Sequence, residues 1–181
     1  MEFKSEKEMA ELFKHFFQSS IKESNMEILE EAKGLFGIPD CILIEKSDKS
    51  IDYIISIELK LKNWKRALKQ AFKYRSFSNE SFVVMDEASI KFVSKKLDLF
   101  IKSNIGLASF NKNIEFKIHY YPKKSTPFSD MFTKKIKNYL SREEDKPVVS
   151  KTQLNNDNLK FNTNKSNCLS SKLSFYSVEA S

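Results

Sequence analysis

The hydrophobic residues of the chain recur at two spacings. In four segments they return every three or four positions, the spacing of an amphipathic helix, and in six shorter segments they alternate or run together as in strands. The expected helices cover residues 6–20, 64–77, 88–102 and 128–140. The expected strands cover residues 25–36, 38–45, 51–61, 81–85, 105–110 and 115–121.

The order of these segments predicts the fold class. A short polar turn separates the strands 38–45 and 51–61, which predicts an antiparallel hairpin. A helix precedes each of the next two strands, 81–85 and 105–110, and helical crossovers join parallel strands. The apolar run Ile42-Leu43-Ile44 indicates that both faces of the sheet are covered. We therefore expect an α/β domain with a central mixed β-sheet flanked by helices.

Composition divides the chain into two parts. Of the 181 residues, 40% are hydrophobic, enough for a core within a domain that we expect to span residues 1–140. Residues 141–181 are polar and lack sustained periodicity, which predicts a disordered C-terminal region. No apolar run approaches about 18 residues and the N-terminus has no signal-peptide pattern, so we expect a cytoplasmic protein without membrane contact. The two cysteines predict neither a disulfide framework nor a zinc site.

The net charge of +7 indicates a polyanionic partner. After residue 140, six basic residues are nearly balanced by five acidic ones, so the excess belongs to residues 1–140. Neutralising phosphates is the sequence-independent part of nucleic-acid binding, which makes DNA or RNA the expected partner. A lysine-rich solvated surface is the simpler alternative.

Candidate chemistry gathers on the expected hairpin. Side chains two apart on a strand share a face, so Glu58 and Lys60 project together while Ile57 and Leu59 point the other way. Antiparallel pairing places Asp40 opposite residue 57 or 58, with facing or diagonal side chains about 5 to 8 Å apart. Two carboxylates this close repel each other unless a cation lies between them, and Mg2+ prefers oxygen ligands. The arrangement therefore predicts a divalent-metal site.

Three motifs in this region resemble one nuclease superfamily. Pro39-Asp40, Glu58-Leu59-Lys60 and the segment Gln70-Ala71-Phe72-Lys73-Tyr74 look like the signature of PD-(D/E)XK, or restriction-endonuclease-like, nucleases, in the branch with a QxxxY helix. The resemblance covers residues 8–111 and implies a restriction-endonuclease-like core. Glu-x-Lys alone is not specific, because it recurs at Glu115-Phe116-Lys117 and elsewhere. The strand before Glu58, the preceding aspartate and the following glutamine helix together distinguish it.

The resemblance implies a role for each motif residue. Asp40 and Glu58, with the backbone carbonyl of Leu59, would bind Mg2+ or Mn2+. Lys60 would orient or activate the water that attacks the phosphate. The helix residues that complete the catalytic group would be Gln70 and Tyr74.

In the resembling family, an acid on the first helix often supports the metal. Glu11 is our first choice for this role and Glu8 is the alternate. Glu8 also fits a capping box with Ser5, and both acids fit ordinary solvated positions.

Basic residues around the expected helix 64–77 predict the contact with nucleic acid. Lys65, Lys69 and Lys73 recur at i,i+4 spacing and form one line, which we call the lysine stripe. Like charges at this spacing slightly destabilise a helix, and an anionic partner would relieve that cost. The full set of expected contacts is Lys62, Trp64, Lys65, Arg66, Lys69 and Lys73. For Trp64, packing in the core is the alternative.

These expectations combine into a Mg2+- or Mn2+-dependent hydrolase that cleaves phosphodiester bonds, with DNA favoured over RNA. A non-catalytic nucleic-acid-binding module and a regulatory interaction module that keep the same fold are the alternatives. A homodimer, and a protein partner bound through residues 141–181, are also compatible with the sequence. The rival motif at Glu115 would use Asp98, which lies inside a helical pattern, and no glutamine-bearing helix follows Lys117.

Overall fold

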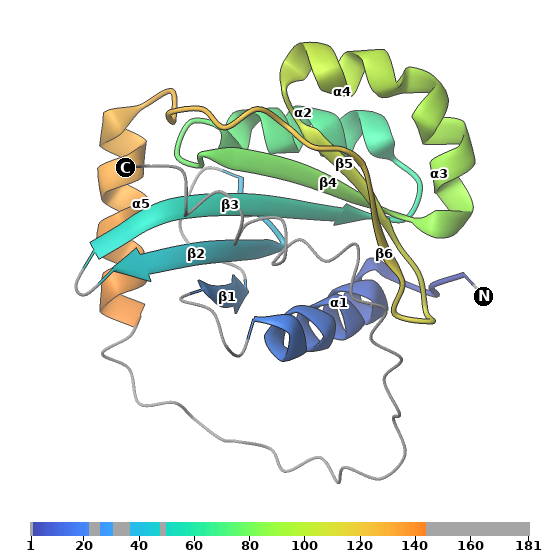
Figure 1. The fold of residues 1–181 in the computed structure, drawn as a ribbon, viewed down its shortest axis with the longest axis horizontal. Coiled ribbons are helices and arrows are strands. Elements are labelled where there is room, and N and C mark those ends of the chain that lie inside the picture. The colour runs from blue at the N-terminus through green and yellow to red at the C-terminus, as the bar shows by residue number, and fades with distance from the viewer. Residues whose placement is uncertain (1, 22–25, 31–36, 48–49, 144–181) are drawn as a thin grey trace, which may run out of the picture.

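A six-stranded β-sheet organises the protein (Figure 1). The computed structural model describes residues 2–21, 26–30, 37–47 and 50–143. In chain order the elements are α1 (Glu6–Ser20), β1 (Met26–Glu30), β2 (Cys41–Ser47), β3 (Ser50–Lys60), α2 (Trp64–Tyr74), β4 (Glu80–Asp86), α3 (Glu87–Val93), the 3-10 turn η1 (Ser94–Lys96), α4 (Leu97–Ser103), β5 (Gly106–Phe110), β6 (Phe116–Tyr120) and α5 (Asp130–Glu143).

The strands follow chain order across the sheet, but their directions are mixed. β1, β2 and β3 pair antiparallel, as do β5 and β6, whereas β3, β4 and β5 pair parallel. Parallel neighbours need crossovers, which α2 and the segment from α3 to α4 provide. The expected α/β class, with a mixed sheet flanked by helices, is confirmed.

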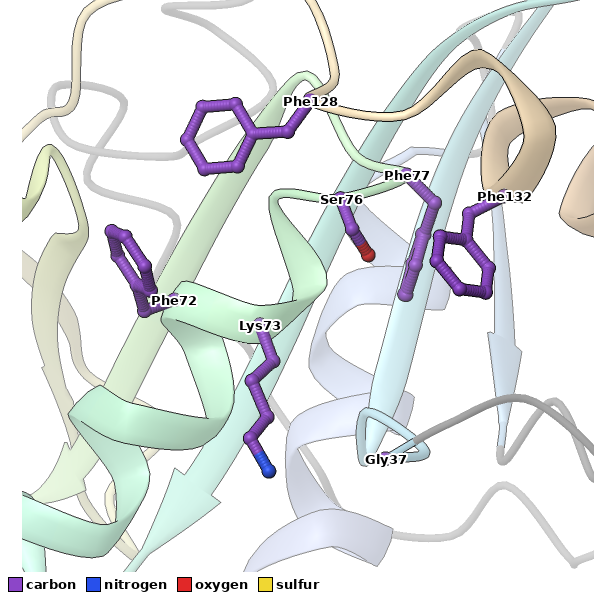
Figure 2. A pocket seen from close by; sticks show the side chains of 7 residues that line it. All are labelled: Gly37, Phe72, Lys73, Ser76, Phe77, Phe128 and Phe132. Atoms are coloured by element: carbon purple, nitrogen blue, oxygen red, sulfur yellow. The ribbon is translucent and has the colours of Figure 1, made fainter.

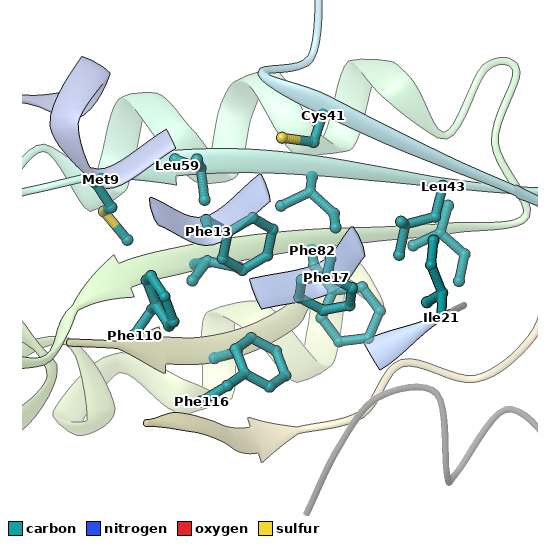
Figure 3. Close-up of a cluster of buried hydrophobic side chains, with 14 of the residues drawn as sticks. Met9, Phe13, Phe17, Ile21, Cys41, Leu43, Leu59, Phe82, Phe110 and Phe116 are labelled. Atoms are coloured by element: carbon teal, nitrogen blue, oxygen red, sulfur yellow. The ribbon is translucent and has the colours of Figure 1, made fainter. Parts of the chain in front are cut away.

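One face of the sheet is covered by α1. Met9, Phe13 and Phe17 recur along this helix and are buried. They pack against inward-pointing strand side chains such as Leu59 and Phe110 (Figure 3). This aromatic layer holds the N-terminal helix against the strands that carry the candidate residues.

The remaining helices cover the opposite face (Figure 1). Ala67 and Ala71 of α2 are fully buried, and their small side chains let the helix lie close to β3 and β4. Right-handed crossovers place α2 and the α3–α4 segment on the same side of the sheet. Ile136 and Leu140 of α5 pack against a core cluster that β2 and β3 share with Tyr74.

Two expected elements differ from the structure in extent. The expected helix 88–102 is divided into α3 and α4 by η1, whose sequence Ser-Lys-Lys has no apolar residue to continue the buried stripe. The expected strand 38–45 begins only at Cys41, because Pro39 has no N–H for the ladder and restricts the residue before it.

The limits of the domain also differ slightly. α5 extends to Glu143 and so crosses the boundary expected at residue 140. Of the expected strand 25–36, the structure describes β1 at 26–30, and residues 31–36 lie outside the described residues, as do residues 144–181 of the expected disordered region. None of the described helices combines the length and hydropathy that crossing a membrane requires.

The first residue of β5 must be glycine because the ring of Phe82 fills the space beside it. Gly106 pairs with Phe82 in the parallel β4–β5 ladder. A Cβ on Gly106 would lie 2.2 Å from Cδ1 of Phe82, a side chain that is only 1% exposed. Close packing on both sides leaves this ring little room to move.

Gly106→Ala should lower the free energy of unfolding by about 1 to 3 kcal/mol, the usual cost of overpacking a core. Urea denaturation followed by circular dichroism measures it. Lys95→Ala, on the exposed 3-10 turn, is the control and should change stability by less than about 0.5 kcal/mol. Equal midpoints for Gly106→Ala and the wild type would show that the Phe82 ring moves aside without cost.

Candidate functional site

The end of β3 brings together the residues expected to carry chemistry. Cys41 of β2 pairs with Ile57 of β3, so Asp40 lies level with Glu58. Cys41 and Ile57 point into the core beneath α1. Because side chains alternate along strands, Asp40, Glu58 and Lys60 face the opposite side, which α2 covers.

Glu58 is the buried centre of this group, with 1% of its surface exposed. Its Oε2 accepts a hydrogen bond from Tyr74 Oη at 2.7 Å, and its Oε1 lies 3.1 Å from Lys60 Nζ. Burial raises the pKa of Glu58, and the charge of Asp40 raises it further, although the bonds from Tyr74 and Lys60 act in the other direction. The ionised form of a buried carboxylate with a raised pKa is stabilised by any further cation that binds its oxygens.

Lys60 is held between two acids from different elements. Its Nζ lies 2.8 Å from Oε2 of Glu6, in the first turn of α1, as well as beside Glu58. Burial acts to lower the pKa of Lys60, but the bond to Glu6 and the charges of Glu58 and Asp40 outweigh it and raise that pKa above its usual value. The ammonium therefore stays charged at neutral pH.

Asp40 fixes the backbone at the end of β3. Its Oδ2 accepts a hydrogen bond from the Leu59 N–H at 2.7 Å. The N–H and C=O of one strand residue point to the same side of the strand, so the Leu59 carbonyl faces the Asp40 side. The expected metal ligands Asp40, Glu58 and the Leu59 carbonyl thus share one edge of β3.

Tyr74 joins α2 to this edge. Its hydroxyl lies 2.7 Å from Glu58 Oε2 and 3.0 Å from the backbone oxygen of Ile38, so its proton is shared between two acceptors. Burial and the charge of Glu58 raise the pKa of Tyr74, which keeps the hydroxyl protonated. Gln70, one turn earlier, also interacts with this hydroxyl.

The amide of Gln70 leaves one acceptor unused. Its Oε1 is buried and has no hydrogen-bond partner among the described residues. Buried polar atoms are nearly always satisfied, so such an atom beside a polar cluster is typical of a position where a ligand donates a hydrogen bond. We call Glu6, Asp40, Glu58, Lys60, Gln70 and Tyr74 the Glu58 cluster.

The acid that α1 contributes is Glu6 and not Glu11 or Glu8. Glu11 is largely exposed and pairs with Lys7 at 4.0 Å. Glu8 caps the helix start, because its Oε2 accepts from the Lys4 N–H while its own N–H donates to Ser5 Oγ. The signal for Glu6 was present in the sequence: it lies three residues before buried Met9 and so shares the sheet-facing stripe.

The donor chemistry of the cluster fits Mg2+ or Mn2+. Asp40 and Glu58 supply two carboxylates, and Mg2+ in proteins usually binds one or two carboxylates together with water and substrate phosphate oxygens. Within the described part of the chain, no group of three or more His, Cys, Asp or Glu side chains is arranged to hold a metal. A metal here would therefore depend on two acids, the Leu59 carbonyl and the substrate.

The lysine stripe lies on the outer side of α2. Lys65, Lys69 and Lys73 are exposed, and so are the neighbouring Lys62 and Arg66. The helix begins at Asn63, whose Oδ1 accepts a hydrogen bond from the Arg66 N–H at 3.2 Å. α2 thus presents positive charge to solvent while its inner side carries Tyr74 to Glu58.

The expected contact of Trp64 with nucleic acid is wrong. Trp64 is 7% exposed and packs in the core with Phe100, their ring centroids 6.2 Å apart. The first residue of α2 turns inward because the helix lies against β4 and α4 at this end, where the indole fills the space between them.

The rival motif does not form a comparable group. Glu115 accepts a hydrogen bond from Asn111 Nδ2 at 2.6 Å, and the same amide group binds Glu87. Asp98 lies on the exposed side of α4 and pairs with Lys102 at 3.9 Å. The acids of that motif are thus engaged in separate structural contacts.

Neither a protein-family model nor a curated protein matches the chain. Among solved structures, a protein of unknown function from Silicibacter pomeroyi is similar over 72% of this chain and 89% of its own length, with 14% sequence identity and a TM-score of 0.41. The interpretation of the site therefore depends on its own geometry.

Proposed function

We propose that the protein is a divalent-metal-dependent nuclease with a restriction-endonuclease-like core, which hydrolyses phosphodiester bonds with DNA favoured over RNA. The observation that carries the proposal is the convergence of Asp40, Glu58 and Lys60 on one face of the sheet. Two acids and a lysine at one edge supply what phosphate hydrolysis needs, a metal site and a fixed positive charge.

Each residue of the cluster has a part in this chemistry. Asp40, Glu58 and the Leu59 carbonyl would hold Mg2+ or Mn2+, which when bound polarises the phosphate and lowers the pKa of the attacking water. Lys60 stabilises the negative charge that develops on the phosphate, because Glu6 and Glu58 keep the ammonium protonated and in place. Tyr74 fixes the orientation of the Glu58 carboxylate.

Nucleic acid is the partner that the charge distribution favours. The lysine stripe lies on the exposed side of the same helix whose buried side carries Tyr74, so a phosphate backbone bound to the stripe would be held by the element that positions Tyr74. A line of cations at helical spacing follows a polyanion better than it binds a small anion.

A non-catalytic nucleic-acid-binding module is the second candidate. It is favoured by the engagement of both Glu58 oxygens, one by Tyr74 and one by Lys60, and by the lack of a third acid at metal-binding distance among the described residues. Binding without cleavage in both Mg2+ and Mn2+ would establish this alternative.

Asp40→Asn and Glu58→Gln should each reduce metal-dependent cleavage by roughly 100-fold or more, because each removes a charged ligand while keeping the side-chain shape. A panel of single-stranded DNA, duplex DNA and RNA, incubated with Mg2+, Mn2+ or EDTA, measures the rate. Glu11→Gln, an exposed acid of α1, is the matched control and should cleave as the wild type does. Wild-type rates in either site variant, or cleavage in EDTA, would refute the proposal.

Removing the lysine stripe should weaken DNA binding and its dependence on salt. For duplex DNA, log K falls as log salt rises, and each lost phosphate contact makes this negative slope less steep by about 0.9. Lys69→Ala and Lys73→Ala, alone and combined, are compared by fluorescence anisotropy at several salt concentrations. Lys95→Ala and Lys96→Ala, on η1, control for net charge. An unchanged slope in the combined stripe variant would exclude α2 from the phosphate contact.

Tyr74→Phe should move the acidic limb of the profile of cleavage rate against pH to higher pH. The Tyr74 hydroxyl stabilises ionised Glu58, so its loss raises the pKa of a carboxylate that burial and Asp40 already raise. Cleavage needs the ionised form, so activity begins at a higher pH than in the wild type. Tyr120→Phe removes a hydroxyl that binds Asn104 and should leave the limb in place. If the acidic limb of Tyr74→Phe lies at the same or a lower pH than in the wild type, the Tyr74 hydroxyl does not stabilise ionised Glu58 and the prediction is wrong.

A further inference from the structure

A pocket of about 440 Å³ opens between the end of α2, the loop that follows it and the start of α5 (Figure 2). Its walls are mostly aromatic. We call it the phenylalanine pocket, and it is lined by Phe72, Phe77, Phe128 and Phe132 together with Gly37, Lys73 and Ser76.

Two of the rings that line the pocket, Phe72 and Phe128, are exposed to solvent. Phe72 is 46% exposed and Phe128 is 57% exposed, with ring centroids 6.0 Å apart. Phe128 is fixed by its N–H, which donates to the Arg75 backbone oxygen at 2.9 Å, and by the Arg75 guanidinium, 4.3 Å from its ring centroid. Arg75 is itself anchored by the backbone oxygen of Ser103 and by Ser125 Oγ. Exposed aromatic surface held in place in this way is typical of a binding site.

Polar groups accompany the rings. In Figure 2 the Ser76 hydroxyl points between the aromatic side chains that line the pocket. Lys73, the last residue of the lysine stripe, lies at the rim. The pocket thus combines flat apolar walls, a hydroxyl and a cation, which matches a planar heterocycle attached to a phosphate.

The pocket adjoins the Glu58 cluster. Phe72 and Lys73 directly precede Tyr74 on α2, and Tyr74 packs on Phe77 with ring centroids 6.0 Å apart. Gly37 lies three residues before Asp40 and has a positive φ of 70°, and a Cβ there would approach the Tyr74 ring to 3.3 Å. A strand of nucleic acid that reaches the cluster along α2 therefore passes the pocket.

We propose that the phenylalanine pocket binds an unpaired nucleobase of the substrate strand. The inference rests on the proposed function and narrows its substrate class to nucleic acid with a single-stranded or displaced nucleotide. Bases stack on aromatic side chains regardless of sequence while basic residues follow the backbone, and this combination is the general mode of single-strand binding. A base in an intact duplex is covered by its neighbours and cannot enter.

Binding is tested with the full-length protein in EDTA, so that cleavage does not affect the result. The probes are a labelled single-stranded DNA of twelve nucleotides and the matching duplex, followed by anisotropy, and a strand that carries 2-aminopurine reports stacking. Phe72→Ala and Phe128→Ala should weaken single-strand binding by about 5- to 100-fold, the range for one lost stacking contact, and should restore 2-aminopurine fluorescence. Duplex affinity should change less than twofold, and Phe72→Tyr should bind the single strand as the wild type does.

Phe92→Ala is the matched control, because Phe92 on α3 is 62% exposed and lies outside the pocket. Unchanged single-strand affinity in Phe72→Ala and Phe128→Ala would refute base binding by the pocket without affecting the proposed nuclease site. A shift in oligomeric state on light scattering without a change in DNA affinity would make a second copy of the chain the occupant, which also overturns it. If the wild type binds only duplex DNA, base binding by the pocket is refuted. The nuclease proposal is then tested separately, by whether Asp40→Asn still cleaves duplex DNA.

Discussion

The burial of the Glu58 carboxylate is the constraint on which the rest of the site depends. An ionised group in the interior costs several kcal/mol unless hydrogen bonds and opposite charge compensate for it. Tyr74 and Lys60 supply that compensation, and each is held by another element, Tyr74 by the packing of α2 and Lys60 by Glu6 of α1. The helices on both faces of the sheet must therefore be docked before the carboxylate is stable in its place.

The helix α2 connects the chemistry to the surface. Its inner side carries Ala67, Ala71 and Tyr74 against the sheet, while its outer side presents the lysine stripe and the exposed ring of Phe72. Since a helix is rigid over three turns, the positive charges, the aromatic wall and the Tyr74 hydroxyl keep fixed positions relative to Glu58. In the proposed nuclease, one short helix would in this way set the distance between the site that holds a strand of nucleic acid and the site that cuts it.

The sequence predicted the local features of the site well and their partners less well. Alternation in β3 placed Glu58 and Lys60 together, and i,i+4 spacing placed Gln70 beside Tyr74, because both follow from the repeat of one element. The choice of Glu11 missed Glu6, although the stripe of buried residues in α1 pointed to it. Trp64 was misplaced because a tryptophan at the start of a helix is equally suited to a core and to a surface.

The amino-acid sequence by itself determined which residues share a face, where most helices and strands lie, and that the excess of basic charge belongs to residues 1–140. These properties depend on periodicity and composition, which act over a few residues. Only the tertiary structure decided that Glu6 reaches Lys60 across 54 positions of sequence and that Trp64 is buried. It also assembled the phenylalanine pocket from residue 37, the end of α2 and the start of α5, because contacts between distant segments depend on how whole elements dock, and no local pattern records that.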